Sequence, residues 1–121
     1  MRTEIQITIP EQISRGESIE IDCKLNVDLA NYKIRAELYD QFYASLRFAT
    51  ENTGGDDTQI EVTDEDKGEF TIHVLRDTTN IFHLISYIEI EIEDENDVMQ
   101  TVYFGIIKFL NDFRPIKWIT P

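Results

Sequence analysis

Apolar and polar residues alternate one by one along most of the chain. Within residues 17–40, two runs at residues 19–27 and 32–39 place an apolar residue at every second position. Successive side chains of a strand point to opposite faces, so each run predicts a strand with one apolar and one polar face. Neither run has the i, i+3, i+4, i+7 spacing of a helix. Residues 28–31 interrupt the alternation with turn-forming Asp and Asn, which predicts a corner between the two strands.

The same alternation predicts strands through the rest of the chain. About eight strands at regular spacing, without a long helix, are typical of a β-sandwich. Asp77 or Thr78 is expected to cap a single helical turn within residues 76–82, where the alternation is lost. We expect one sandwich domain in residues 1–110 and a tail in residues 111–121. The further predicted strands are residues 4–9, 44–50, 58–63, 69–75, 84–94 and 98–110.

The inward-facing positions of these strands define a predicted core. Its members are the apolar residues that share the inward phase of each alternating run. They are Ile5, Ile7, Ile19, Ile21, Cys23, Leu25, Ile34, Ala36, Leu38, Ile60, Val62, Phe70, Ile72, Val74, Ile88, Ile90, Ile92, Val102, Phe104 and Ile106.

The chain is strongly acidic, with 24 acidic and 11 basic residues among 121 and a formal net charge of −13. Such a surface repels phosphate, so we expect no nucleic-acid partner and no anionic membrane. It is compatible with a basic partner, and it also keeps an all-β protein with open sheet edges in solution. The first residues lack the basic and then apolar pattern of a signal segment, which favours synthesis in a cytoplasm.

No group of residues predicts catalysis or a bound cofactor. Cys23 is the only cysteine and lies in the inward phase, which predicts a core thiol. His73 and His83 lack ligand partners at metal-binding spacing, and the alternation places His73 on an outer face. Three acidic clusters, at residues 56–57, 64–66 and 94–97, lack the spacing of a calcium loop. We therefore expect a protein that is not an enzyme and that holds neither a cofactor nor a metal.

An ordered series of motifs runs through residues 13–114. Its parts are RGES at residues 15–18, DLANYKIRA at 28–36, GEFTI at 68–72, DTT at 77–79 and QTV followed by a glycine at 100–105. In this order the motifs resemble small phage and prophage virion proteins with an immunoglobulin-like fold, such as the N-terminal domain of the phage baseplate upper protein.

The resemblance implies an antiparallel immunoglobulin-like β-sandwich of about 7–9 strands. It also implies a non-enzymatic structural or assembly module of a phage or prophage tail or baseplate. Such a protein is made in the cytoplasm of the bacterial host and is located in the virion.

Two features predict that the chain works through protein–protein contacts. The strand at residues 98–110 is apolar on both faces, which suits a central strand or one covered by another subunit. The tail carries further apolar residues, which either bind a partner or cover the sheet of their own chain. We expect a homo-oligomer, other virion proteins as partners, or both, with Tyr103, Arg114 and Trp118 as the interface anchors.

A second class of function remains open. Exposed aromatic side chains also bind sugars and receptors. The chain is then a carbohydrate- or receptor-binding module that uses Tyr39, Phe42, Tyr43 or Trp118.

Overall fold

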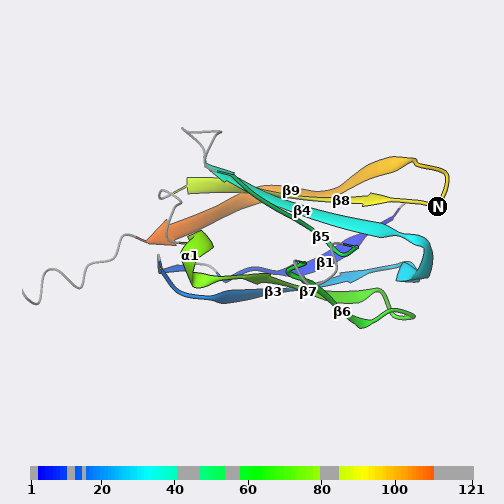
Figure 1. Cartoon of the computed structure of the whole chain (residues 1–121), viewed down its shortest axis with the longest axis horizontal. Helices are drawn as coiled ribbons and strands as arrows, with labels where there is room; N and C mark the ends of the chain where they lie inside the picture. Colours follow the sequence, from blue (N-terminus) through cyan, green and yellow to red (C-terminus); the bar gives the residue numbers. More distant parts are fainter. Residues whose placement is uncertain are drawn as a thin grey trace, which may run out of the picture.

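A computed structural model of the chain describes residues 3–10, 13–14, 16–40, 47–53, 58–79 and 85–110. Within these ranges the backbone forms nine strands and two short helical turns, arranged in two facing layers (Figure 1). The predicted all-β fold is confirmed. The elements are β1 (Ile5–Thr8), β2 (Ile13–Ser14), β3 (Ile19–Leu25), the 3-10 turn η1 (Leu29–Asn31), β4 (Lys33–Asp40), β5 (Arg47–Glu51), β6 (Ile60–Asp64), β7 (Glu69–Val74), α1 (Arg76–Thr79), β8 (Ile85–Glu93) and β9 (Met99–Leu110).

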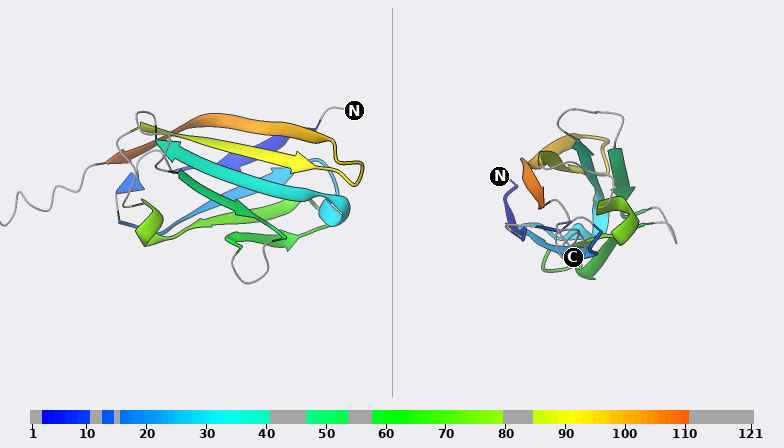
Figure 2. Two further views of the ribbon diagram at one scale, coloured as in Figure 1. Left: turned by 45° about the horizontal axis from the view of Figure 1, so that its top comes forward. Right: turned by 90° about the vertical axis from the view of Figure 1, so that its left-hand side faces the viewer.

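The strands form two sheets. One has four strands in the order β1-β3-β7-β6, and the other has five in the order β2-β9-β8-β4-β5. Figure 2 shows the two layers in two further views. Neighbouring strands are antiparallel, except that β2 runs parallel to the end of β9. The strand predicted at residues 44–50 corresponds to β5, which lies at an edge of its sheet.

Most of the predicted core lies between the sheets. The predicted inward residues of β3, β4, β7 and β8 are buried, apart from Ile19 at the start of β3, and Ile21 and Ile90 are fully buried. Ile5, Ile7 and Ile19 are half-buried and pack against this core. Val62 was predicted to be buried but is 36% exposed, because it lies on an edge strand next to an irregularity in the pairing of β6 with β7.

The second half of β9 contradicts the predicted core. Phe104 and Ile106 were predicted to face inward, but their side chains are 57% and 54% exposed. Ile107 and Phe109, which the alternation placed on the outer face, are each only 1% exposed. The inward and outward faces of this half-strand are therefore exchanged relative to the prediction.

A β-bulge explains this exchange. Glu91 of β8 lies opposite Thr101, whereas its neighbour Ile90 lies opposite Tyr103. Val102 is thus an extra residue without a partner in β8. One extra residue reverses the inward and outward phases of everything that follows it in the strand.

The predicted corner after β3 is confirmed as the turn η1. The Asp28 carboxylate accepts a hydrogen bond from the Ala30 N–H at 2.9 Å, as expected of a cap. Leu29 is only 3% exposed, and its N–H donates to the Glu65 carbonyl oxygen at 2.9 Å. The corner is therefore bound to the turn between β6 and β7.

The predicted helical turn is present as α1, which is held by its last residue. Asp77 or Thr78 was predicted to cap it, but both lie inside the turn, after its first residue. Thr79 is fully buried. Its hydroxyl donates to the Glu17 carbonyl oxygen at 2.8 Å and accepts from the Gly16 N–H at 3.1 Å. One side chain thus connects α1 to the segment that precedes β3.

We expect Thr79→Val to lower the free energy of unfolding by about 1–3 kcal/mol, because valine keeps the shape of threonine but leaves both backbone groups without their partner. Urea denaturation measures this loss. Thr79→Ser keeps the hydroxyl and serves as the control, and equal losses in the two variants would contradict the assignment.

Candidate interaction surface

The outer face of the five-stranded sheet is divided into two ends of different chemistry. It is formed by the side chains of β4, β8 and β9 that alternate with the core residues. At one end lie Tyr39, Tyr87, Phe104 and Ile106, which we call the aromatic end. At the other end lie charged residues of β4 and β8.

The residues of the aromatic end come together across three neighbouring strands. Tyr39 lies opposite Tyr87, and Tyr87 lies opposite Ile106. The rings of Tyr39 and Tyr87 have centroids 5.4 Å apart, and those of Tyr87 and Phe104 are 5.5 Å apart with 20° between their planes. Since Phe104 and Ile106 are more than half exposed, this surface offers apolar area of the kind that marks interaction sites.

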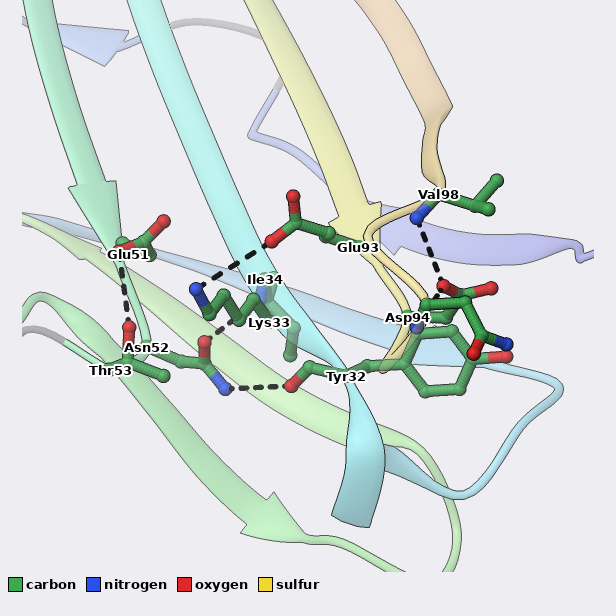
Figure 3. Close-up of polar contacts among 10 residues, drawn as sticks. Tyr32, Lys33, Ile34, Glu51, Asn52, Thr53, Glu93, Asp94 and Val98 are labelled. Atoms are coloured by element: carbon green, nitrogen blue, oxygen red, sulfur yellow. Dashed lines mark hydrogen bonds and ion pairs between the residues drawn. The ribbon is translucent and has the colours of Figure 1, made fainter.

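Ion pairs occupy the other end of the face. Lys33 Nζ lies 3.6 Å from Glu93 Oε2. Figure 3 shows this ion pair beside the Asn52 side chain, which accepts from the Ile34 N–H of β4 and donates to the Tyr32 carbonyl oxygen. Arg35 donates to Glu37 Oε1 from Nη2 at 2.7 Å and from Nε at 2.8 Å. The carboxylates along the outer face of β8 are therefore part of a network with two cations.

The Glu91 carboxyl in this network has a raised pKa. Burial raises the pKa of the Glu91 carboxyl above its ordinary value, and the neighbouring carboxylates Glu89 and Glu37 raise it further. The Arg35 guanidinium opposes these effects. The folded protein therefore favours the protonated form of Glu91 more than the unfolded chain does.

We expect Glu91→Gln to raise the melting temperature at neutral pH. A raised pKa in the folded state means that the ionised side chain destabilises the fold, and this cost appears as the pH rises through the raised pKa. The gain should shrink as the pH falls below the ordinary glutamate pKa of about 4.3. Thermal melts at a series of pH values test this, with Glu95→Gln in the exposed turn after β8 as the control. A gain that is independent of pH would contradict it.

The predicted interface anchors are distributed differently. Tyr103 is half-buried and packs against the core, with its ring over Gly105, where an added Cβ would lie 2.5 Å from the Tyr103 hydroxyl oxygen. Arg114 and Trp118 lie outside the described residues. Phe104 and Ile106 are exposed apolar residues of β9 instead. The signal for them in the sequence was a strand with apolar residues on both faces.

Of the aromatic residues predicted to bind sugars or receptors, only some lie within the described residues. Tyr39 belongs to the aromatic end. Phe42, Tyr43 and Trp118 lie outside the described residues. Tyr87 joins this surface although the sequence analysis did not select it, because only the strand pairing places it beside Tyr39.

The opposite sheet presents a polar outer face. His73 lies on this outer face, as predicted, and is only partly exposed. Its Nε2 lies 2.9 Å from Glu61 Oε1, and its Nδ1 lies 3.6 Å from Glu20 Oε1. The Thr71 hydroxyl donates to the Asp22 carboxylate at 2.9 Å. Both ring nitrogens of His73 thus face carboxylates, which describes a solvated polar network.

The remaining reactive groups have structural explanations. Cys23 is 4% exposed, so the predicted core thiol is confirmed. Burial, aided by the Asp22 carboxylate, raises the pKa of this thiol to about 12, which removes its nucleophilic form at neutral pH. The Asp94 carboxylate accepts the N–H groups of Asn96 and Val98 and so forms the turn between β8 and β9.

Two of the three acidic clusters, residues 64–66 and 94–97, lie within the described residues. Part of the first cluster lies near Asp28, the residue that caps η1. The carboxylate oxygens of Asp28, Glu65 and Asp66 lie within 4.8 Å of one another, and all three residues are exposed. Exposed carboxylates in turns commonly gather without an ion. Residues 56–57, the other cluster, lie outside the described part of the chain, as does His83.

Comparison of the sequence with models of protein families and with curated proteins found no match. Among the described residues there is no helix with the length and apolar character needed to cross a bilayer.

Proposed function

We propose that this protein is a non-enzymatic assembly module that acts through protein–protein contacts made by the aromatic end. The observation that carries the proposal is the exposure of Phe104 and Ile106, each more than half accessible, beside the stacked rings of Tyr87 and Tyr39. The strand that bears them, β9, contains Lys108 but no carboxylate, in a chain with a net charge of −13. An apolar area that carries no carboxylates can be covered by a partner without removing negative charges from water, so docking there has the lowest desolvation cost.

The strand order supports an immunoglobulin-like fold for the module. In immunoglobulin sandwiches, lettered in chain order, strands A, B, E and D form one sheet and C, F and G the other, with C′ added beside C in variable-type domains. The order β1-β3-β7-β6 matches A-B-E-D, and β9-β8-β4-β5 matches G-F-C-C′. This agreement supports the resemblance to immunoglobulin-like phage virion proteins.

We accordingly place the module in a phage or prophage tail or baseplate, assembled with copies of itself, with other virion proteins, or with both. It is made in the bacterial host cytoplasm and needs no nucleic acid, membrane or cofactor for this role.

Mass spectrometry of gradient-purified particles from the source host tests the virion assignment. We expect the chain to co-purify with other tail proteins and to be captured by them when immobilised. A matched bait carrying Phe104→Glu should capture less, whereas Leu75→Glu, at a half-exposed position that follows β7 of the other sheet, should not. Absence of the chain from particles would overturn the assignment.

The tail, residues 111–121, offers a separate comparison. Light scattering on the full chain and on a chain shortened to end at Leu110 shows whether the tail takes part in assembly. A lower mass after shortening would support a tail contact with a partner. An unchanged mass with a lower melting temperature would show that the tail covers its own sheet.

The alternative function is a carbohydrate- or receptor-binding module. The nearly parallel rings of Tyr87 and Phe104 favour it, because sugars stack on aromatic faces. A glycan array discriminates between the two functions. Reproducible binding that is lost in Phe104→Ala or Trp118→Ala would support this class and not the assembly module.

A further inference from the structure

The charges on the outer face of the five-stranded sheet are separated along the strands. Outward-facing residues that lie opposite one another on neighbouring strands form a row across the face, which we call a level. Three successive levels are compared. The middle level holds Tyr39, Tyr87 and Ile106, which lie opposite one another on β4, β8 and β9. On one side the next level holds Glu37, Glu89 and Phe104, and on the other side it holds Ile85 and Lys108.

Lys108 is the cation at the apolar end of this face. It is exposed, and within the described part of the chain it takes part in no ion pair. The carboxylates Glu89, Glu91 and Glu93 all lie on the opposite side of Tyr87. The face therefore has Lys108 on one side of the aromatic rings, and on the other side a net-acidic group in which the carboxylates outnumber Lys33 and Arg35.

From this arrangement we propose that the aromatic end binds the aromatic end of a second copy of the chain. The two sheets face each other across a two-fold axis that lies in the interface, passes near Tyr87 and runs across the strands. The strands of the two copies then point in opposite directions. This inference rests on the proposed assembly function and names the partner and its orientation.

Charge decides the orientation. With the axis across the strands, the level of Lys108 in one copy lies over the level of Glu89 in the other, so opposite charges meet. Glu91 is four residues from Tyr87, about 13 Å along the strand at roughly 3.3 Å per residue. The two Glu91 side chains are then about 26 Å apart, well beyond the screening length of about 8 Å at physiological salt.

An axis along the strands gives the opposite result. It would place the acidic levels of the two copies over one another at the separation of packed sheets, about 10 Å. For a chain with a net charge of −13, that contact sets together two net-acidic ends, in which the carboxylates outnumber Lys33 and Arg35. Two-fold contacts are also the commonest in homo-oligomers, and each uses the same patch on both copies.

Sedimentation equilibrium on the full chain tests the apolar part of the contact. We expect a dimer for the wild-type protein and a loss of affinity of roughly 30-fold or more in Ile106→Glu, the size of a hot-spot effect. Leu75→Glu is the matched control, because Leu75 is 50% exposed, as Ile106 is 54% exposed, and lies outside this face. Its affinity should stay within about twofold of wild type, as for a site outside the interface.

A charge exchange tests the orientation. Glu89→Lys makes the chain less acidic, so a general charge effect would strengthen the dimer. In the proposed arrangement it instead opposes Lys108 of the second copy and weakens the dimer by about fivefold. Lys108→Glu should also weaken it, and the double variant should restore the affinity. Glu95→Lys, which makes the same charge change in the exposed turn, should not weaken it.

Each other outcome overturns the inference. A wild-type chain that stays monomeric at all concentrations removes the second copy as the partner, yet leaves the proposed function testable by capture of other tail proteins. A dimer that survives Ile106→Glu forms elsewhere. A monomer whose melting temperature falls in Ile106→Glu has this face covered by its own chain. A Glu89→Lys dimer of unchanged or higher affinity excludes the orientation in which the two-fold axis runs across the strands.

Discussion

Replacing Ile90 by alanine is expected to lower the free energy of unfolding by about 2–5 kcal/mol, the usual cost of truncating a buried isoleucine. Ile90 is fully buried in the middle of β8. It lies opposite Ala36 on one side and Tyr103 on the other, so strands flank it on both sides. The surrounding backbone is fixed by two ladders and cannot collapse into the space left behind, which keeps the cavity open.

Urea denaturation measures this loss, and two matched variants give its scale. Ile90→Val removes one methylene group and should cost about 0.5–1.5 kcal/mol. Ile106→Ala changes the same residue type on a neighbouring strand at a 54% exposed site, and should cost less than about 0.5 kcal/mol. A loss below about 1 kcal/mol for Ile90→Ala would mean that the site relaxes, and so contradict a tightly packed core.

Most strands and most of the core were predictable because they depend on local alternation alone. Runs such as β3 and β8 have apolar residues at alternate positions, and their predicted inward residues are buried except Ile19, which is half-buried. Leu29 and Ile13 were missed because the prediction of buried residues depends on alternation. Each is a single buried side chain in a segment that does not alternate, so no pattern distinguishes it from an exposed residue.

The phase of β9 was not predictable, because the bulge leaves no mark in the sequence. Val102, Tyr103 and Phe104 are all large and apolar, so the strand fits an inward face in either phase. The choice is made by β8, which leaves Val102 without a partner. Only the cross-strand register contains that information.

The candidate surface was predicted in kind but not in its residues. The two apolar faces of the last strand were interpreted as a central strand or one covered by another subunit, and in the structure Phe104 and Ile106 on one of these faces are exposed. The same phase error selected Tyr103, which packs against the core, in place of Phe104. Tyr39 and Tyr87 are far apart in the sequence, so their contact required the pairing of β4 with β8.

Gly68 is the position where the backbone itself leaves no room for a side chain. It has a φ of +75°, a region that costs other residues about 1–2 kcal/mol. A Cβ added there would meet the carbonyl oxygens of Leu25 and Val27, the latter at 2.6 Å. The Leu25 N–H donates to the Gly68 carbonyl oxygen at 2.9 Å, so the turn between β6 and β7 is held directly against the end of β3.

We therefore expect Gly68→Ala to lower the free energy of unfolding by about 3 kcal/mol or more, because the strained φ adds to the loss of this backbone contact. Gly68→Asn separates the two causes, since asparagine tolerates positive φ but still carries a Cβ. If close approach dominates, urea denaturation will show Asn to be nearly as destabilising as Ala. If Asn restores most of the stability, the conformation alone is responsible. Lys67→Ala in the same turn removes only an exposed ion pair and should change stability by less than about 0.5 kcal/mol. A comparable loss there would show that the whole turn is sensitive, and would remove the special role of Gly68.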